Sequence, residues 1–108
     1  MPPEIQELER RIVDGAAELP SSVRRSAASG SHTANALVDR FVRTVRERAY
    51  TLTDDDVCEL GRAGMTDTEI FELTVAAAFG AARLRLVRAL AVLEEARAEP
   101  ARLDGGRA

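Results

Sequence analysis

The chain has 108 residues and a formal net charge of −3, with fifteen arginines, no lysine, one cysteine and one histidine. This length favours a single domain, and the acidic balance does not favour nucleic-acid binding. A lone cysteine excludes an intrachain disulfide and any zinc site built on cysteine pairs. The charged first residues do not read as a secretory signal, and no run of about 18 apolar residues occurs. We therefore expect a cytoplasmic protein with no membrane partner.

The first predicted element is a helix from about residue 3 to 18. Two prolines precede it, and proline is tolerated at a first helical position because its missing N–H would have no partner there. Apolar residues recur at helical spacing and form a thin stripe, namely Ile5, Leu8 and Ile12. A turn at 20–22, a short helix at 23–28 and a polar loop at 29–33 are predicted to follow.

The clearest amphipathic helix is predicted over residues 34–49. Its apolar residues share one face of a helix with about 3.6 residues per turn; they are Ala34, Leu37, Val38, Phe41, Val42, Val45 and Ala49. Thr33 or Asn35 is the candidate N-cap. Arg48 projects at the edge of the apolar stripe.

Two consecutive helix starts carry capping signals. Thr53 begins a short helix over 53–63, and the three aspartates that follow it suit the positive end of a helix. Consecutive helical residues point in different directions, so these carboxylates are not expected to converge on a metal ion. Gly64 suits the left-handed position after the helix, and a second capping box runs from Thr66 to Glu69.

The last predicted helix runs from residue 67 to about 97. Residues 70–82 are apolar on nearly all sides, a pattern that is typical of a buried helix. Few other helices are available to cover it within one chain. We therefore expect a homo-oligomer whose interface uses this helix together with the 34–49 helix. Gly80, in the middle, predicts either a kink or close packing.

Few residues are able to carry chemistry. Cys58 has acidic neighbours that disfavour a thiolate, and we interpret it as a small core residue. His32 lies in a Gly/Ser loop and is interpreted as facing solvent rather than acting as a general base. Arg85 and Arg88 either pair with carboxylates or extend to solvent, with ligand binding as the alternative. No motif predicts a cofactor or a metal.

Residues 53–90 resemble the alkylhydroperoxidase D-like superfamily, which includes the carboxymuconolactone decarboxylases. The matching features are the helix end Ala63-Gly64, the helix start from Thr66 to Ile70, Glu72, the alanine-rich run to Gly80, Arg85, and Ala89-Leu90. The resemblance implies a small all-α domain of this type, assembled as a homo-oligomer. We place that domain at 1–99 and a flexible tail at 100–108.

The redox motif of the peroxidase members, Cys-x-x-Cys-x-x-x-His, has no counterpart here. In that register the three positions are Ala49, Leu52 and Asp56. A thiol–disulfide cycle needs two sulfurs, so peroxidase activity is not expected. The first hypothesis is a non-redox family member that acts as an oligomeric module for binding a small molecule or another protein.

Two alternatives remain open at this point. One is a cryptic lactone decarboxylase or isomerase, for which the resemblance nominates Arg85 and Glu72, with Arg48 and His32 as further candidates. The other is a helical protein that acts on a different polypeptide. A pocket around Arg85 with a carboxylate nearby would favour the enzyme, and a solid alanine core would favour an interaction module.

Overall fold

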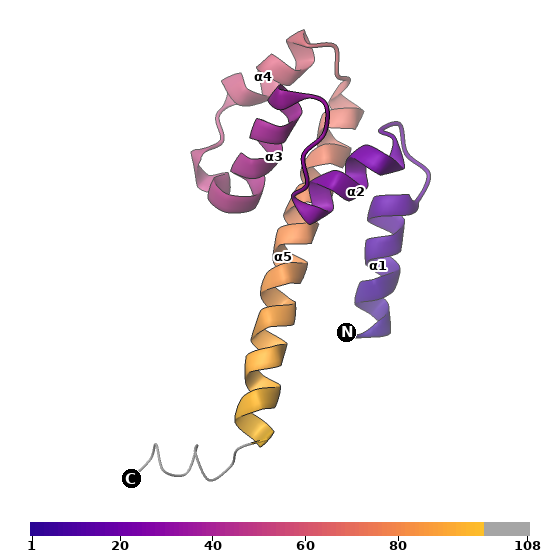
Figure 1. Ribbon diagram of the computed structural model, residues 1–108. Helices are drawn as coiled ribbons and strands as arrows, with labels where there is room; N and C mark the ends of the chain where they lie inside the picture. Colours follow the sequence, from indigo (N-terminus) through magenta and orange to yellow (C-terminus); the bar gives the residue numbers. More distant parts are fainter. Residues whose placement is uncertain (99–108) are drawn as a thin grey trace.

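The computed structural model describes residues 1–98, and α-helices make up most of this part of the chain (Figure 1). The elements in chain order are α1 (Pro3–Asp14), α2 (Ser21–Ser29), α3 (Ala36–Arg48), the 3₁₀ turn η1 (Ala49–Thr51), α4 (Asp54–Arg62) and α5 (Asp67–Ala98). No strand occurs among the described residues, and the all-α class is confirmed there. The predicted tail at 100–108 lies outside the described residues.

Helix α1 ends four residues earlier than its sequence predicts. It stops at Asp14, and Gly15 continues in an extended conformation. The amides of Glu18 and Leu19 do not join the helix, because both donate hydrogen bonds to the carboxylate of Glu72 on α5. A contact with a distant helix therefore overrides the local preference for continuing α1.

The hydrogen bonds at the start of α3 show which of the two candidate residues is its N-cap. The side chain of Asn35 accepts hydrogen bonds from the amides of Leu37, at 3.0 Å, and Val38, at 3.2 Å. Thr33 instead donates to Asp39 from its amide and its hydroxyl, both at 2.8 Å. These bonds lower the pKa of the Asp39 carboxyl because they stabilise the charged form.

Both predicted capping boxes are present. At the start of α4, Thr53 accepts from the amide of Asp56, and the Asp56 carboxylate accepts from the amide of Thr53. Thr66 and Glu69 form the same reciprocal pair at the start of α5. Gly64, with φ of 104°, occupies the left-handed position that ends α4, as predicted.

The first half of α5 is the axis around which the other helices pack (Figure 1). The buried cluster of the core comes from the α1–α2 connection and from α2, α3, α4 and α5. Its residues are Leu19, Ala27, Val38, Phe41, Val42, Val45, Leu60, Ile70, Leu73, Ala76 and Ala77. Helix α2 packs against α5 with the backbone of Ala28 directly beside Gly80. Of the two predictions made for this glycine, close packing is therefore the one that the structure confirms.

Only one side of residues 70–82 is buried within a single chain, and the expectation that a second copy covers the remaining sides stays a prediction. Leu73 and Ala76 are fully covered, whereas Phe71 is 68% exposed and Ala82 is exposed. The helices that pack around α5 reach only the side that carries Leu73. The apolar face of α3 is already covered within the chain.

Candidate functional site

Glu72 is a structural residue of the α1–α2 connection. Its Oε1 atom accepts from the amide of Leu19 at 2.9 Å and from the amide of Glu18 at 3.1 Å, and its Oε2 atom accepts from Glu18 at 3.2 Å. The carboxylate thus replaces the hydrogen-bond acceptors that these amides would have in a helix. Both of its oxygens are engaged by the backbone.

Arg85 lies far from Glu72 along the same helix. Thirteen residues separate them, which corresponds to about 20 Å of helical rise. Arg85 is exposed, and its Nη2 atom donates to the backbone carbonyl of Arg46 at 3.0 Å. The two residues nominated for a lactone site are therefore not brought together.

The other two candidates also lie apart from a shared centre. The His32 side chain is 89% exposed, as its loop position predicts, and its Nδ1 atom is 3.5 Å from Oδ2 of Asp39. Arg48 is exposed at the end of α3, where its backbone carbonyl accepts a hydrogen bond from the Thr51 hydroxyl at 2.7 Å. Neither side chain faces Arg85 or Glu72 in the contacts of the described residues.

Cys58 is exposed, so the interpretation of this residue as part of the core is wrong. Leu60 is the buried residue of α4, at 1% exposure, and Cys58 lies two positions before it. Two residues are about 200° apart around a helix, which turns the thiol to the solvent side when Leu60 faces the core. Both residues are apolar in the sequence, and only the packing of α4 decides which of them faces the core.

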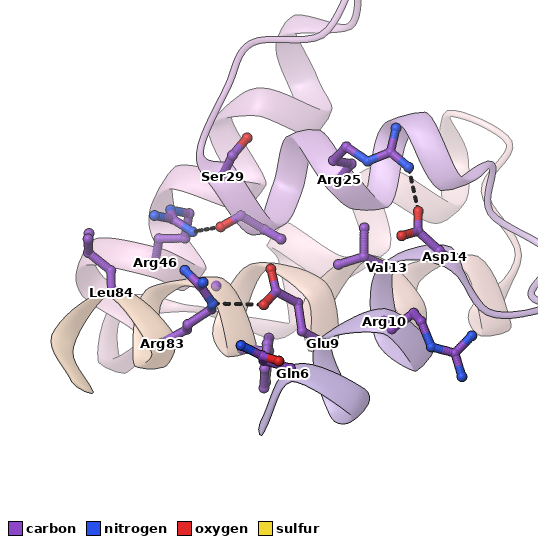
Figure 2. Close-up of a pocket in the computed structure, with 13 residues that line it drawn as sticks. Gln6, Glu9, Arg10, Val13, Asp14, Arg25, Ser29, Arg46, Arg83 and Leu84 are labelled. Atoms are coloured by element: carbon purple, nitrogen blue, oxygen red, sulfur yellow. Dashed lines mark hydrogen bonds and ion pairs between the residues drawn. The ribbon is translucent and has the colours of Figure 1, made fainter. Parts of the chain in front are cut away.

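A cleft of about 440 Å³ lies between α1, α2 and the middle of α5, and its lining residues include Glu9, Arg46, Gly80, Arg83 and Leu84. Figure 2 shows that Arg46 and Arg83 extend into the same part of the cleft, while the guanidinium of Arg10 points away from them. The lining comes from helices that are far apart in the sequence. No local motif therefore indicates this cleft.

The two arginines that extend into the cleft have partners within the chain: Arg83 is near a carboxylate, and Arg46 binds carbonyl oxygens at a helix end. Nε of Arg83 lies 2.8 Å from Oε2 of Glu9, although its N–H is not aligned for a hydrogen bond. Arg46 donates from Nη1 to the carbonyl oxygens of Ala28, at 2.6 Å, and Ala27, at 3.3 Å, at the end of α2. A cation there is favourable for the helix dipole. The arrangement offers guanidinium groups for an anion and no nucleophile paired with a base.

Helix α5 continues past α2, α3 and α4, and its C-terminal end lies beyond all of the other helices (Figure 1). Every residue from 84 to 95 is exposed, and we call residues 84–98 the free half of α5. Its large apolar side chains are between 37% and 66% exposed, and they are Leu84, Leu86, Val87, Leu90, Val92 and Leu93. A helix of 15 residues is about 22 Å long, so this apolar surface is extended.

Comparisons of the chain with known protein families, with curated proteins and with solved structures each found no match. None of the described helices combines the length and the apolar character that crossing a bilayer requires. Within residues 1–98, no group of three or more histidine, cysteine, aspartate or glutamate side chains is arranged to hold a metal ion.

Proposed function

We propose that this protein is a non-redox interaction module of the carboxymuconolactone decarboxylase-like type, which assembles as a homo-oligomer through the free half of α5. The observation that carries the proposal is the exposure of all residues from 84 to 95. Apolar surface of this extent on a small protein is typical of an interaction site. Leu86, Leu90 and Leu93 recur at spacings of four and three residues, which places them in one stripe along the helix.

The stripe has the form that helix–helix packing requires. Side chains three and four residues apart make the ridges that enter the grooves of a neighbouring helix. Such packing would remove these leucines from water, and burial of apolar surface is the main favourable term in protein association. The interface is proposed on the free half rather than on α3, because the apolar face of α3 is already used in the core.

Light scattering coupled to size-exclusion chromatography tests self-association. We expect more than one chain per particle, and a monomer after Leu86→Glu combined with Leu90→Glu. The matched control is Val92→Glu, because Val92 is 66% exposed on the opposite side of the helix from Leu90. A monomeric wild-type protein, or equal loss in the control, contradicts the proposal. Circular dichroism verifies that each variant remains helical.

Small-molecule binding in the cleft is the second candidate function. A volume of about 440 Å³ is within the range of ligand pockets. Arg46 has no carboxylate partner among the contacts of the described residues, and a guanidinium is well suited to bind carboxylate or phosphate. We expect phosphate to raise the melting temperature more than chloride at equal ionic strength. This difference is expected to disappear in Arg46→Met and to persist in the exposed-residue control Arg43→Met.

Catalysis by Arg85 and Glu72 receives less support from the geometry than either of these functions. The lactone decarboxylase alternative needs both side chains in one pocket, and about 20 Å of helix separates them. Thiol peroxidase activity is also not expected, because Cys58 has no second cysteine to resolve a sulfenic acid. Peroxide consumption with a dithiol reductant that is lost in Cys58→Ala would contradict this expectation.

A further inference from the structure

The cleft between α1, α2 and α5 is lined by more positive than negative side chains, although the whole chain has a net charge of −3. Its charged lining residues are Arg10, Arg25, Arg46, Arg83, Glu9 and Asp14. Glu9 and Asp14 each form an ion pair with an arginine of the lining. Arg10 pairs instead with Glu7, which lies outside the lining. Among the described residues, Arg46 is therefore the arginine of this cleft that has no carboxylate partner.

Arg46 and Arg83 keep hydrogen-bond donors for a ligand. In the Arg46 guanidinium only Nη1 donates among the described contacts, and its partners are the carbonyl oxygens of Ala28 and Ala27. The Nε atom of Arg83 is buried and has no aligned hydrogen-bond partner in the described part of the chain. A buried donor in this state costs free energy that a well-placed acceptor would recover. Because a guanidinium has five N–H donors, Arg83 is able to keep Glu9 beside it and bind a second carboxylate.

We propose that the cleft binds an amphipathic monocarboxylate, whose carboxylate lies between the guanidinium groups of Arg46 and Arg83. The proposal rests on small-molecule binding in the cleft, the second function proposed above, and adds the class of ligand. Figure 2 shows that both arginines extend into the same part of the cleft. With the ligand bound, charges alternate in sign from Arg46 through the carboxylate and Arg83 to Glu9, so a negative charge separates the two cations.

The charge balance of the cleft selects a monocarboxylate over a phosphate. A single negative charge matches the one arginine that has no carboxylate partner. A phosphate monoester carries about −1.5 to −2 at neutral pH, which exceeds this balance and adds repulsion from Glu9. A carboxylate also accepts two parallel N–H bonds from one guanidinium. Arg46 is half-buried, so water and salt screen its charge less than they screen a fully exposed one.

The apolar part of the lining favours a ligand with an alkyl or aryl portion. Val13 of α1 and Phe79 and Leu84 of α5 line the same cleft as the two guanidinium groups. Phe79 is half-buried and Leu84 is 47% exposed, so a ligand is able to cover apolar surface that is now in contact with water. The volume of about 440 Å³ accommodates a body beyond the carboxylate itself. The ligand is therefore expected to combine one negative charge with several apolar carbons.

Hexanoate is the probe that tests this class, and acetate and hexanol are the matched comparisons. In NMR titrations, the dissociation constant for hexanoate is expected to be at least about tenfold lower than that for acetate, which lacks the chain, or for hexanol, which lacks the charge. A smaller preference in either comparison overturns the proposal. If phosphate still stabilises the protein in that case, small-molecule binding in the cleft stands. Absence of any response to both hexanoate and phosphate overturns the proposal and the second function together.

Two pairs of variants test the charged and the apolar contacts separately. Arg46→Met is expected to raise the hexanoate dissociation constant at least about fivefold, and Arg43→Met, outside this cleft, less than about twofold. Leu84→Ser is expected to raise it at least about threefold and to leave acetate binding unchanged, whereas Val92→Ser is the control on the same helix. Leu84 is exposed, so this pair remains decisive if Arg46→Met does not fold. Equal effects within the Leu84 and Val92 pair overturn the proposal.

Discussion

Gly80 lies directly against the backbone of Ala28 at the crossing of α2 and α5. A β-carbon at residue 80 would be 1.8 Å from the Ala28 carbonyl oxygen and 2.6 Å from its α-carbon. Both neighbours are main-chain atoms, which are unable to move aside as a flexible side chain would. The crossing that organises the fold therefore depends on the absence of a single methyl group.

Replacing Gly80 by alanine is expected to destabilise the protein by about 3 kcal/mol, because the added carbon must push two helices apart. Chemical denaturation measures the effect. The matched control is Gly61→Ala, since Gly61 is also helical and a β-carbon there would have nothing within 4 Å. That variant should be neutral or up to about 1 kcal/mol more stable. Equal stabilities of the two variants would show that α2 and α5 do not cross as described.

Removal of the Glu72 carboxylate is expected to loosen the connection between α1 and α2. Glu72→Ala leaves the amides of Glu18 and Leu19 without their acceptor, which should cost about 1–3 kcal/mol of stability. Hydrogen exchange at these two amides should accelerate as well. Glu95→Ala, on the exposed half of the same helix, should change stability by less than about 0.5 kcal/mol. Unchanged exchange in Glu72→Ala would contradict the assigned role.

Arg24 is a buried cation that joins two backbone segments, with only 4% of its surface exposed. Its guanidinium donates to the carbonyl oxygens of Leu19 and Ile12, both at 3.0 Å. Arg24→Met keeps much of the apolar volume and removes both donors, so we expect a loss of at least about 2 kcal/mol in thermal or chemical denaturation. Arg25→Met, which removes an exposed ion pair with Asp14, should cost less than about 1 kcal/mol. Similar losses in both variants would argue against the buried contacts.

The pKa of Asp39 should lie below its ordinary value in a carboxyl NMR titration. Hydrogen bonds from the amide and then the hydroxyl of Thr33 stabilise its charged form, and His32 adds a smaller effect. Because the folded pKa is lower than the unfolded value of about 3.9, this stabilisation is present above about pH 4 and is lost as the pH falls through the folded pKa. Acid unfolding in this range should therefore become less pH-dependent in Asp39→Asn.

A second titration separates the two Thr33 bonds. Thr33→Val removes the hydroxyl donor and keeps the amide, so the pKa of Asp39 should rise part of the way towards its ordinary value. Thr44→Val is the control, because the Thr44 hydroxyl donates to the Arg40 carbonyl in its own helix. An Asp39 pKa that is equally changed in both variants would contradict the assigned cause.

The sequence by itself determined the local limits of the later helices. Thr53 and Thr66 cap helices through partners three residues away, and Gly64 ends α4 through its own backbone conformation, while for α3 the sequence left Thr33 and Asn35 as alternative caps. Such interactions are complete within one turn of chain, so their signals survive without knowledge of the fold. The apolar period of α3 is equally local. Val38, Phe41, Val42 and Val45 are buried as predicted, whereas Ala34 and Ala49, predicted on the same face, lie outside the helix and are exposed.

Tertiary structure alone decided the features that join distant parts of the chain. The end of α1 depends on Glu72, more than fifty residues away, and the cleft joins Glu9, Arg46 and Arg83 from three helices. The sequence also did not determine which side of α5 faces the core, because a helix that is apolar on nearly all sides has no single face that stands out as the buried one. Packing of α2 against Gly80 chose the covered side, and the length of α5 beyond the other helices left its second half exposed.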